Sequence, residues 1–137
     1  MVLAACLAVA VIFGVTPVLN KYILQSISVE QLVVMSGLLF GVGAALYGSY
    51  RGLWGSIQTV DVETWGLVAA SATLIFAVAN YLYLTAIRDG KTYVAAAITA
   101  SYPLVTALVG YLLFKERLTM QHLLGIVLVI GGVAALV

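Results

Sequence analysis

The chain has 137 residues, of which 64% are hydrophobic and only 8% are charged, and its formal net charge is +1. Soluble domains carry about 25% charged residues, so this composition cannot supply the polar exterior of a soluble fold. It excludes a water-soluble enzyme, a secreted disulfide scaffold and a nucleic-acid-binding protein, since one cysteine closes no intrachain bridge and no basic surplus meets phosphates. We expect a multi-pass protein of the plasma or inner membrane, in contact with lipid, with no cofactor and no enzymatic activity.

Five apolar segments are long enough to be membrane helices, which need about 20 residues to cross the hydrocarbon core. They cover roughly residues 2–24, 31–50, 64–87, 92–114 and 119–137. The alternation of apolar and polar residues that marks barrel strands is missing. No basic residue precedes the first segment, so we expect a retained helix rather than a cleaved signal. The sequence predicts an all-α fold, a single five-helix transmembrane domain over residues 1–137.

Signals that start helices lie at three of the breaks between these segments. Ser28 with Gln31 three residues later fits a capping box that opens the second helix. Asp61 is a suitable cap for the third helix and Thr119 for the fifth. The break between residues 51 and 63 contains apolar side chains, including Trp54, and we expect it to lie in the headgroup region.

Aromatic rings gather toward the two expected membrane faces, as they do in interfacial belts. The residues concerned are Tyr47, Tyr50, Trp54 and Trp65 on one face and Tyr22, Tyr81, Tyr83 and Tyr93 on the other. We interpret them as interfacial anchors. For Tyr81 and Tyr83, stacking on a ligand is the alternative.

The Lys and Arg residues favour neither orientation in the membrane. Five spans would place Arg51, Lys115 and Arg117 on one side and Lys21, Arg88 and Lys91 on the other. Orientation normally follows an imbalance of basic residues between short loops, and here the two sides are equal. Two interpretations stay open. Other determinants set one orientation, or the protein inserts both ways and pairs with an inverted copy of itself.

Small residues form stripes on two of the predicted helices, and helices in lipid pack closely along such stripes. We interpret these stripes as packing or dimer faces. The positions are Gly37, Gly41 and Gly48 in the second helix and Gly125, Gly131 and Gly132 in the fifth.

No Asp, Glu, Lys, Arg or His lies in the middle of any predicted span. Buried ionisable groups usually serve as proton relays and cation sites, so we do not expect coupling to protons through a buried carboxylate. Polar residues at depth are neutral. Among them, Asn80 in the third helix either bonds to a neighbouring helix or contacts a ligand, because a polar group at depth needs a partner.

Pro17 and Pro103 are the two prolines, and each lies inside a predicted helix. A proline removes one backbone hydrogen bond and frees a carbonyl of the preceding turn, so we expect a kink at Pro17. Freed carbonyls at mid-depth either bind substrate, as in the interrupted helices of transporters, or form a packing kink satisfied by a neighbouring hydroxyl. Thr99, Tyr102 and Thr106 share a helix face with Pro103, and this face is the best candidate for a path lining.

Three ionisable residues lie near the ends of predicted helices or in a loop between them. Lys21 at the end of the first helix either extends to the interface or attracts an anionic substrate group. His122 has no partner at metal-ligand spacing, so no metal site is expected. Glu116 is interpreted as a solvated loop charge.

The last third of the chain resembles one family of transporters. Ser101-Tyr102-Pro103-Leu104-Val105 is followed by Leu112-Leu113-Phe114-Lys115-Glu116-Arg117-Leu118-Thr119, then by Gln121, Gly125 and Gly131-Gly132-Val133. This ordered combination is similar to the C-terminal half of an EamA-type repeat of the drug/metabolite transporter superfamily. The stretch Ile12-Phe13-Gly14 through Pro17 to Lys21 looks like the first helix of that repeat.

The resemblance implies a carrier in which two inverted five-helix repeats enclose the substrate path. It therefore implies a second, inverted copy of the repeat. Members commonly carry an Arg near the start of the second helix, and here that stretch reads Val34-Met35-Ser36-Gly37. The related four-helix drug exporters use a Glu in their first helix. This chain has none there, so proton-coupled export of cationic drugs is not expected.

We therefore predict a transporter of a small metabolite, such as an amino acid or a similar polar or amphipathic solute, working by alternating access in an antiparallel homodimer. The alternative is a non-transporting membrane assembly subunit, or half of a heterodimeric carrier with a second repeat protein. The predicted substrate path comprises Gly14, Thr16, Pro17, Asn20, Lys21, Asn80, Tyr83, Thr99, Ser101, Tyr102, Pro103 and Thr106.

Overall fold

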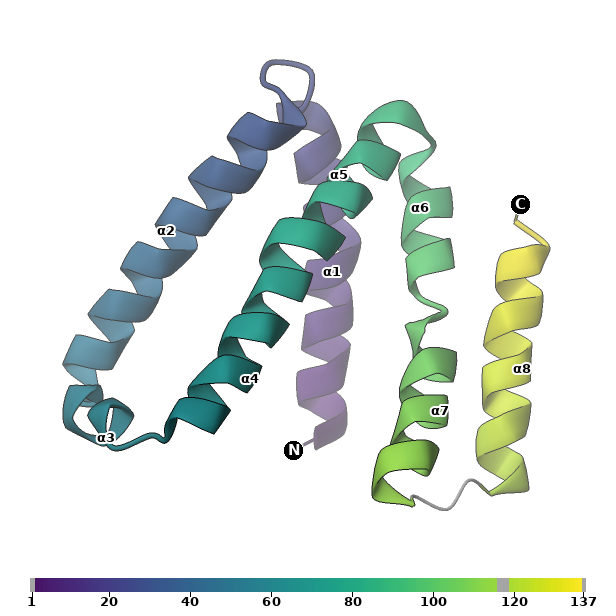
Figure 1. Ribbon diagram of the computed structural model, residues 1–137. Helices are drawn as coiled ribbons and strands as arrows, with labels where there is room; N and C mark the ends of the chain where they lie inside the picture. The colour runs from purple at the N-terminus through teal and green to yellow at the C-terminus, as the bar shows by residue number, and fades with distance from the viewer. Residues whose placement is uncertain (1, 116–118, 137) are drawn as a thin grey trace. The chain divides into compact units, whose positions relative to one another are not determined.

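The computed structural model describes residues 2–115 and 119–136, and every regular element in those two ranges is a helix (Figure 1). The elements are α1 (Val2–Ile23), α2 (Val29–Tyr50), α3 (Trp54–Gln58), α4 (Val62–Ala72), the π-helix η1 (Thr73–Ala79), α5 (Asn80–Asp89), α6 (Thr92–Thr99), α7 (Tyr102–Phe114) and α8 (Met120–Ala134). The all-α fold expected from the sequence is confirmed. Glu116 and Arg117, whose charges entered the sequence argument, lie outside the described ranges.

Four helical stretches of the described chain are long and apolar enough to cross a membrane. They are Val2–Ile23, Val29–Tyr50, Val62–Asp89 and Thr92–Phe114. The helix expected as the fifth span, α8, has 15 residues. At 1.5 Å per residue it is about 22 Å long, shorter than the roughly 30 Å of a hydrocarbon core. The chain is a multi-pass integral membrane protein, and a fifth crossing by α8 stays a prediction.

The helix starts expected from the sequence are confirmed. The Gln31 amide donates to the Ser28 hydroxyl at 3.2 Å, and the Ser28 amide donates to the Gln31 side-chain oxygen at 2.9 Å. This reciprocal pair is a capping box, which satisfies amide hydrogens that have no partner inside the helix. Asp61 caps α4 and Thr119 caps α8 in the same positions that the spacing predicts.

Two predicted spans are irregular in ways that the sequence did not predict. The fourth, expected as one helix over residues 92–114, is interrupted at Ala100 and Ser101 and forms α6 and α7. Pro103 is therefore the second residue of α7 rather than an interior residue. A proline is tolerated in the first turn of a helix, since the amide hydrogens there have no acceptor within the helix. The third span contains the seven-residue π-helix η1, a wide turn often found at functional sites. Helix α1, by contrast, continues through Pro17.

The structure divides the chain into two compact units, residues 1–18 with 89–137 and residues 19–88. In the second unit a small apolar core lies where α1 ends, α2 begins and α5 ends. Its buried members are Leu24, Val29, Leu32, Leu84 and Ile87. Helices α2 and α5 converge on this core, and α2 and α4 lie farther apart toward α3 (Figure 1). Farther along, α2 meets η1 through the rings of Phe40 and Phe76, whose centroids are 4.8 Å apart.

Helix α3 folds back on the end of α2. The Trp54 indole donates to the Ser49 hydroxyl at 3.1 Å, and its ring lies 3.4 Å from the point that a Cβ on Gly48 would occupy. Gly48 is buried by this contact. Gly52, just before α3, has a φ of +64°, a backbone conformation that glycine adopts without strain. The short segment between the second and third spans is thereby anchored by an aromatic ring, as expected at a membrane interface.

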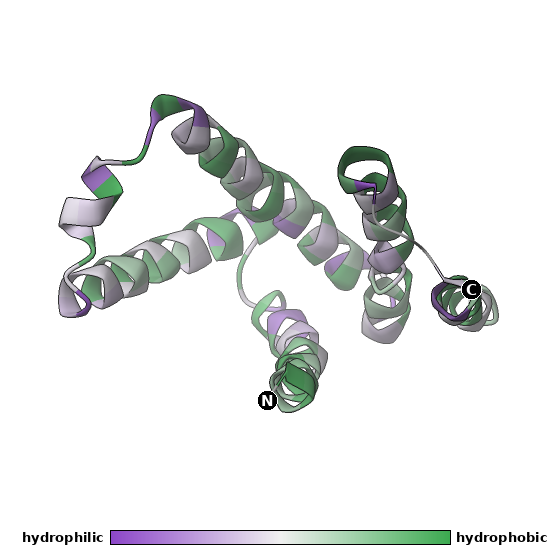
Figure 2. Cartoon of the chain, turned by 90° about the horizontal axis from the view of Figure 1, so that it is seen from below, coloured by the Kyte–Doolittle hydropathy of each residue, from purple (hydrophilic) through white to green (hydrophobic). Residues whose placement is uncertain are grey.

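Most apolar side chains are exposed in the single chain. Hydrophobic residues recur along the long helices (Figure 2). Leu39, for example, is 73% exposed and Leu113 is 70% exposed. Lipid tails are as apolar as these side chains, so helices in a bilayer do not need to bury them. The exposed apolar surface is consistent with an environment of lipid or of further helices.

The cap at Asp61 makes the stability of α4 depend on pH. The Thr64 amide and hydroxyl donate to its carboxylate at 2.9 and 2.8 Å, and these bonds hold the pKa of that carboxyl below its ordinary 3.8. The stabilisation is complete above 3.8 and is lost as the pH falls through the lower folded-state pKa. We expect Asp61→Ala to lower the thermal midpoint at neutral pH, as followed by circular dichroism in detergent. The fall in the thermal midpoint between neutral and acid pH should be smaller in this variant than in the native chain. Asp61→Asn, which keeps an acceptor, is the control, and an alanine variant with an unaltered acid-side decrease would contradict this account.

Candidate substrate site

The interruption between α6 and α7 releases backbone carbonyls from their helical partners. Pro103 has no amide hydrogen, so the Thr99 carbonyl lacks the donor four residues ahead. The Ser101 amide donates to the Ile98 carbonyl at 3.1 Å. In a regular α-helix it would donate to the Ala97 carbonyl instead. The middle of the fourth predicted span therefore presents carbonyl oxygens that the helix itself does not satisfy. In a bilayer such groups need a partner from another helix, from water or from a solute.

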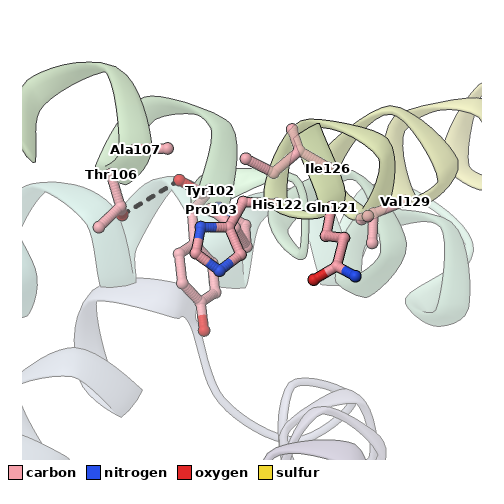
Figure 3. Close-up of a pocket in the computed structure, with 9 residues that line it drawn as sticks. Tyr102, Pro103, Thr106, Ala107, Gln121, His122, Ile126 and Val129 are labelled. Carbon is pink, nitrogen blue, oxygen red and sulfur yellow. Dashed lines mark hydrogen bonds between the residues drawn. The ribbon is translucent and has the colours of Figure 1, made fainter. Parts of the chain in front are cut away.

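A groove of 640 Å³ lies between α7 and α8, within the first unit (Figure 3). This volume is in the range of small-molecule sites. Residues from both helices line it: Tyr102, Pro103, Thr106, Ala107, Gln121, His122, Gly125, Ile126 and Val129. Its α7 wall begins directly after the interruption, so the released carbonyls and the groove belong to the same part of the chain.

Three residues of the predicted path meet in this groove: Tyr102, Pro103 and Thr106. The Tyr102 side chain is 63% exposed. The Thr106 hydroxyl donates to the Tyr102 carbonyl at 3.2 Å, a bond back to its own helix (Figure 3). Thr16 makes the same kind of bond, to the Ile12 carbonyl at 2.7 Å. These threonine hydroxyls keep their accepting capacity, because each is used only as a donor.

The α8 wall contains two polar residues that the predicted path omitted, Gln121 and His122. The signal that could have found them is their spacing, since positions 121, 122, 125, 126 and 129 form one face of a helix. Gly125, expected as a packing residue, lies on this face as well. Sequence reasoning treated His122 only as a metal ligand without partners and did not consider it as part of a groove.

Lys21 closes the end of a helix in the second unit. Its ammonium donates to the carbonyls of Ile87 and Arg88 at 2.7 and 2.8 Å, where α5 ends. A cation at a helix C-terminus satisfies free carbonyls and complements the helix dipole. This role was not among the two that the sequence suggested. Contact of Lys21 with a substrate stays a prediction.

Three other path residues belong to the second unit, Asn20 on α1 and Asn80 and Tyr83 on α5. Asn20, Asn80 and Tyr83 are each partly buried. The backbone N–H of Asn80 donates to the Ile75 carbonyl five residues earlier, so Asn80 is the residue that closes the π-helix. Nearby, the Tyr81 hydroxyl donates to the Glu30 carboxylate at 3.2 Å, linking α5 to the start of α2.

The remaining residues of the predicted path lie in the first unit. Pro17 is buried, while Gly14 has open space where a Cβ would project. The same openness holds for most of the predicted packing glycines. Apart from the neighbouring residues and backbone of its own helix, no described atom comes within 4 Å of the Cβ position at Gly37, Gly41, Gly125, Gly131 or Gly132. Their role as packing or dimer faces stays a prediction.

An all-helical chain with several membrane-crossing stretches, an interrupted helix and a groove of neutral polar residues has the features of a membrane transporter. Residues 1–137 match the EamA-like transporter family, and the chain belongs to this family. A Pseudomonas aeruginosa protein described as an uncharacterized transporter is 30% identical to it over 128 residues, which are 90% of this chain and 42% of that protein. The chain thus spans less than half the length of this relative. No solved structure matches it.

The Lys21 contacts generate a test of stability. Lys21→Met removes the donors from the carbonyls of Ile87 and Arg88. We expect a loss of about 1.5 to 3 kcal/mol in the free energy of unfolding, the range for hydrogen bonds to a charged group, seen as a lower thermal midpoint in detergent. Lys21→Arg keeps donors at this position and is the matched control. Equal midpoints for the methionine variant and the native chain would show that the contacts contribute nothing.

Proposed function

We propose that this EamA-family chain carries a small metabolite, such as an amino acid or a similar polar or amphipathic solute, across the membrane by alternating access. The observation that supports this most directly is the interruption between α6 and α7, which lies next to the groove that α7 and α8 form. Interrupted helices with released carbonyls are a common form of transporter substrate site. Tyr102 and Pro103 belong to both features.

The lining of the groove supports transport that is not driven through a buried charge. None of its nine residues is an Asp, Glu, Lys or Arg. A cation site inside a membrane normally needs such a group, and proton relays use carboxylates or histidine, of which this lining contains His122 alone. The solute is therefore recognised by neutral hydrogen-bonding groups and apolar walls, without coupling to a buried carboxylate.

We further propose that two copies of the chain form the carrier, in antiparallel orientation. The similar Pseudomonas protein is more than twice as long as the segment that matches it, which supports a second repeat-sized partner. Equal numbers of basic residues on the two expected sides allow both orientations. The open faces at Gly37 and Gly41 are suited to close contact with another helix. A heterodimer with a different repeat protein is the second candidate.

The site assignment is tested by flux. We expect Tyr102→Ala and Pro103→Ala each to lower uptake into proteoliposomes by about tenfold, equivalent to about 1.4 kcal/mol, without lowering membrane abundance. Uptake is measured with a pool of radiolabelled amino acids. Leu108→Ala is the control, because Leu108 lies on α7 but outside the groove lining. Native flux in both groove variants would refute the assignment.

The antiparallel dimer is tested by biasing orientation. Two lysines inserted beside Arg51 add positive charge to one side, which should force a single orientation. We expect transport to disappear and to return when a partner with the opposite bias is co-expressed. Orientation is read from a single cysteine at Gly90, in a Cys6→Ala background, labelled in intact and permeabilised cells. Transport by chains in one orientation alone would rule out the antiparallel homodimer and favour the heterodimer.

A further inference from the structure

We propose that Gln121 and His122 form the head-group site for a small aliphatic carboxylate, whose hydrocarbon part lies in the groove between α7 and α8. This inference rests on the proposed transport function and specifies the chemistry that its groove selects. Both side chains line the groove, and both lie on the first turn of α8 (Figure 3). Neither belongs to the substrate path expected from the sequence.

The cap of α8 determines which nitrogen of His122 carries the proton. The Thr119 amide donates to Nδ1 of His122 at 3.5 Å, and the His122 amide donates to the Thr119 hydroxyl at 3.3 Å. An imidazole that accepts at Nδ1 carries its hydrogen on Nε2 when it is neutral. The capping box therefore uses His122 as an acceptor on one side of the ring and leaves a hydrogen-bond donor on the other.

The polar groups at this end of the groove suit an acceptor better than a donor. Nε2 of His122 supplies one hydrogen, and the Gln121 amide supplies two. No carboxylate is present among the lining residues to receive an ammonium group. A carboxylate accepts several hydrogen bonds and has none to donate, so its needs match this set. An amine that has no carboxylate would direct its own hydrogens at the Nε2 hydrogen of His122, with no carboxylate in the lining to accept them.

Apart from Tyr102 and Thr106, the rest of the groove lining is apolar and suits a short hydrocarbon chain. Helix α8 returns beside α7, so its first turn lies at one end of the groove and Val129 lies two turns farther along (Figure 1). The apolar part of the lining consists of Pro103, Ala107, Gly125, Ile126 and Val129. Such walls would keep the methylene groups of a ligand away from water. The arrangement therefore selects a compact molecule with one carboxylate and one branched or short aliphatic chain.

The single histidine of the chain allows a direct test by nuclear magnetic resonance. Protein labelled with ¹⁵N-histidine is placed in phosphatidylcholine nanodiscs, and sodium isovalerate is added, with isopentylamine as the amine of the same skeleton. We expect the free protein to show the Nε2-protonated tautomer. Isovalerate should shift the Nε2 signal in a saturable manner, while isopentylamine should not.

Variants then separate the head-group site from the walls of the groove. His122→Leu and Gln121→Leu should each weaken isovalerate binding by roughly tenfold or more, measured by saturation-transfer difference, as loss of a hydrogen bond to a charged group implies. Met120→Leu is the matched control, since Met120 is in the same turn but outside the lining. The Nδ1-protonated tautomer, equal binding of the amine, or native affinity in both leucine variants would overturn the proposal. So would histidine contacts to lipid acyl chains that isovalerate does not displace.

The binding experiment and the flux experiment distinguish a failure of this site from a failure of the proposed function. Saturable isovalerate binding without flux of any solute would keep the site and refute the proposed function. Flux of amino acids that Tyr102→Ala abolishes, together with no isovalerate effect on His122, would keep the function and refute this site.

Discussion

Backbone hydrogen bonding in hydrocarbon is the constraint on which the rest of this structure depends. A chain with 8% charged residues cannot form a polar surface in contact with water, and its spans lie in hydrocarbon. Each amide and carbonyl in a span therefore needs a partner within the protein. Helices satisfy that requirement internally, which explains why every described element is helical. The same requirement gives weight to the few places where the helical pattern fails. At α6–α7 the carbonyls of Ala97 and Thr99 are released, and at η1 the bonds run to the fifth residue.

The polar side chains of the described chain mostly compensate for helix ends rather than pair with one another. Ser28, Asp61 and Thr119 accept from first-turn amides, and Lys21 donates to last-turn carbonyls. Each of these contacts fixes the residue at which a helix starts or stops, and so determines where the turns lie. His122 is an exception of functional interest, because it takes part in a cap and also lines the groove. One residue thereby couples the start of α8 to the chemistry of the proposed site.

The two units differ in how they are stabilised. The unit of residues 19–88 has a buried apolar core where three helices converge, together with the Lys21 contacts and the Tyr81–Glu30 bond. In the other unit, residues 1–18 and 89–137, the α7–α8 pair encloses a groove and the small residues of α8 have open space around them. A core at one end leaves the remaining helix faces available to lipid or to another helix. That division is compatible with a carrier in which a second copy completes the enclosure of the solute.

The sequence alone determined the class of protein, the approximate positions of four spans, the three capped helix starts and the resemblance to EamA transporters. These properties depend on composition and on contacts within a few residues, which the order of residues specifies directly. Of the residues that it placed on one face with Pro103, Tyr102 and Thr106 line the groove with it, while Thr99 lies on α6, before the interruption. It treated residues 92–114 as one span and left open an interruption or a kink at Pro103, because a proline alone does not reveal whether a helix bends or ends.

Only the tertiary structure decided which separate segments meet. It paired Lys21 with the end of α5, brought Gln121 and His122 to the groove that Tyr102 also lines, and placed Trp54 over Gly48. Periodicity orders residues along one helix but contains no information about which face of another helix lies opposite. In an apolar environment almost every face is hydrophobic, so the pattern that identifies neighbours in a soluble protein is absent. The choice of partner therefore comes from shape and from a few polar contacts between distant residues.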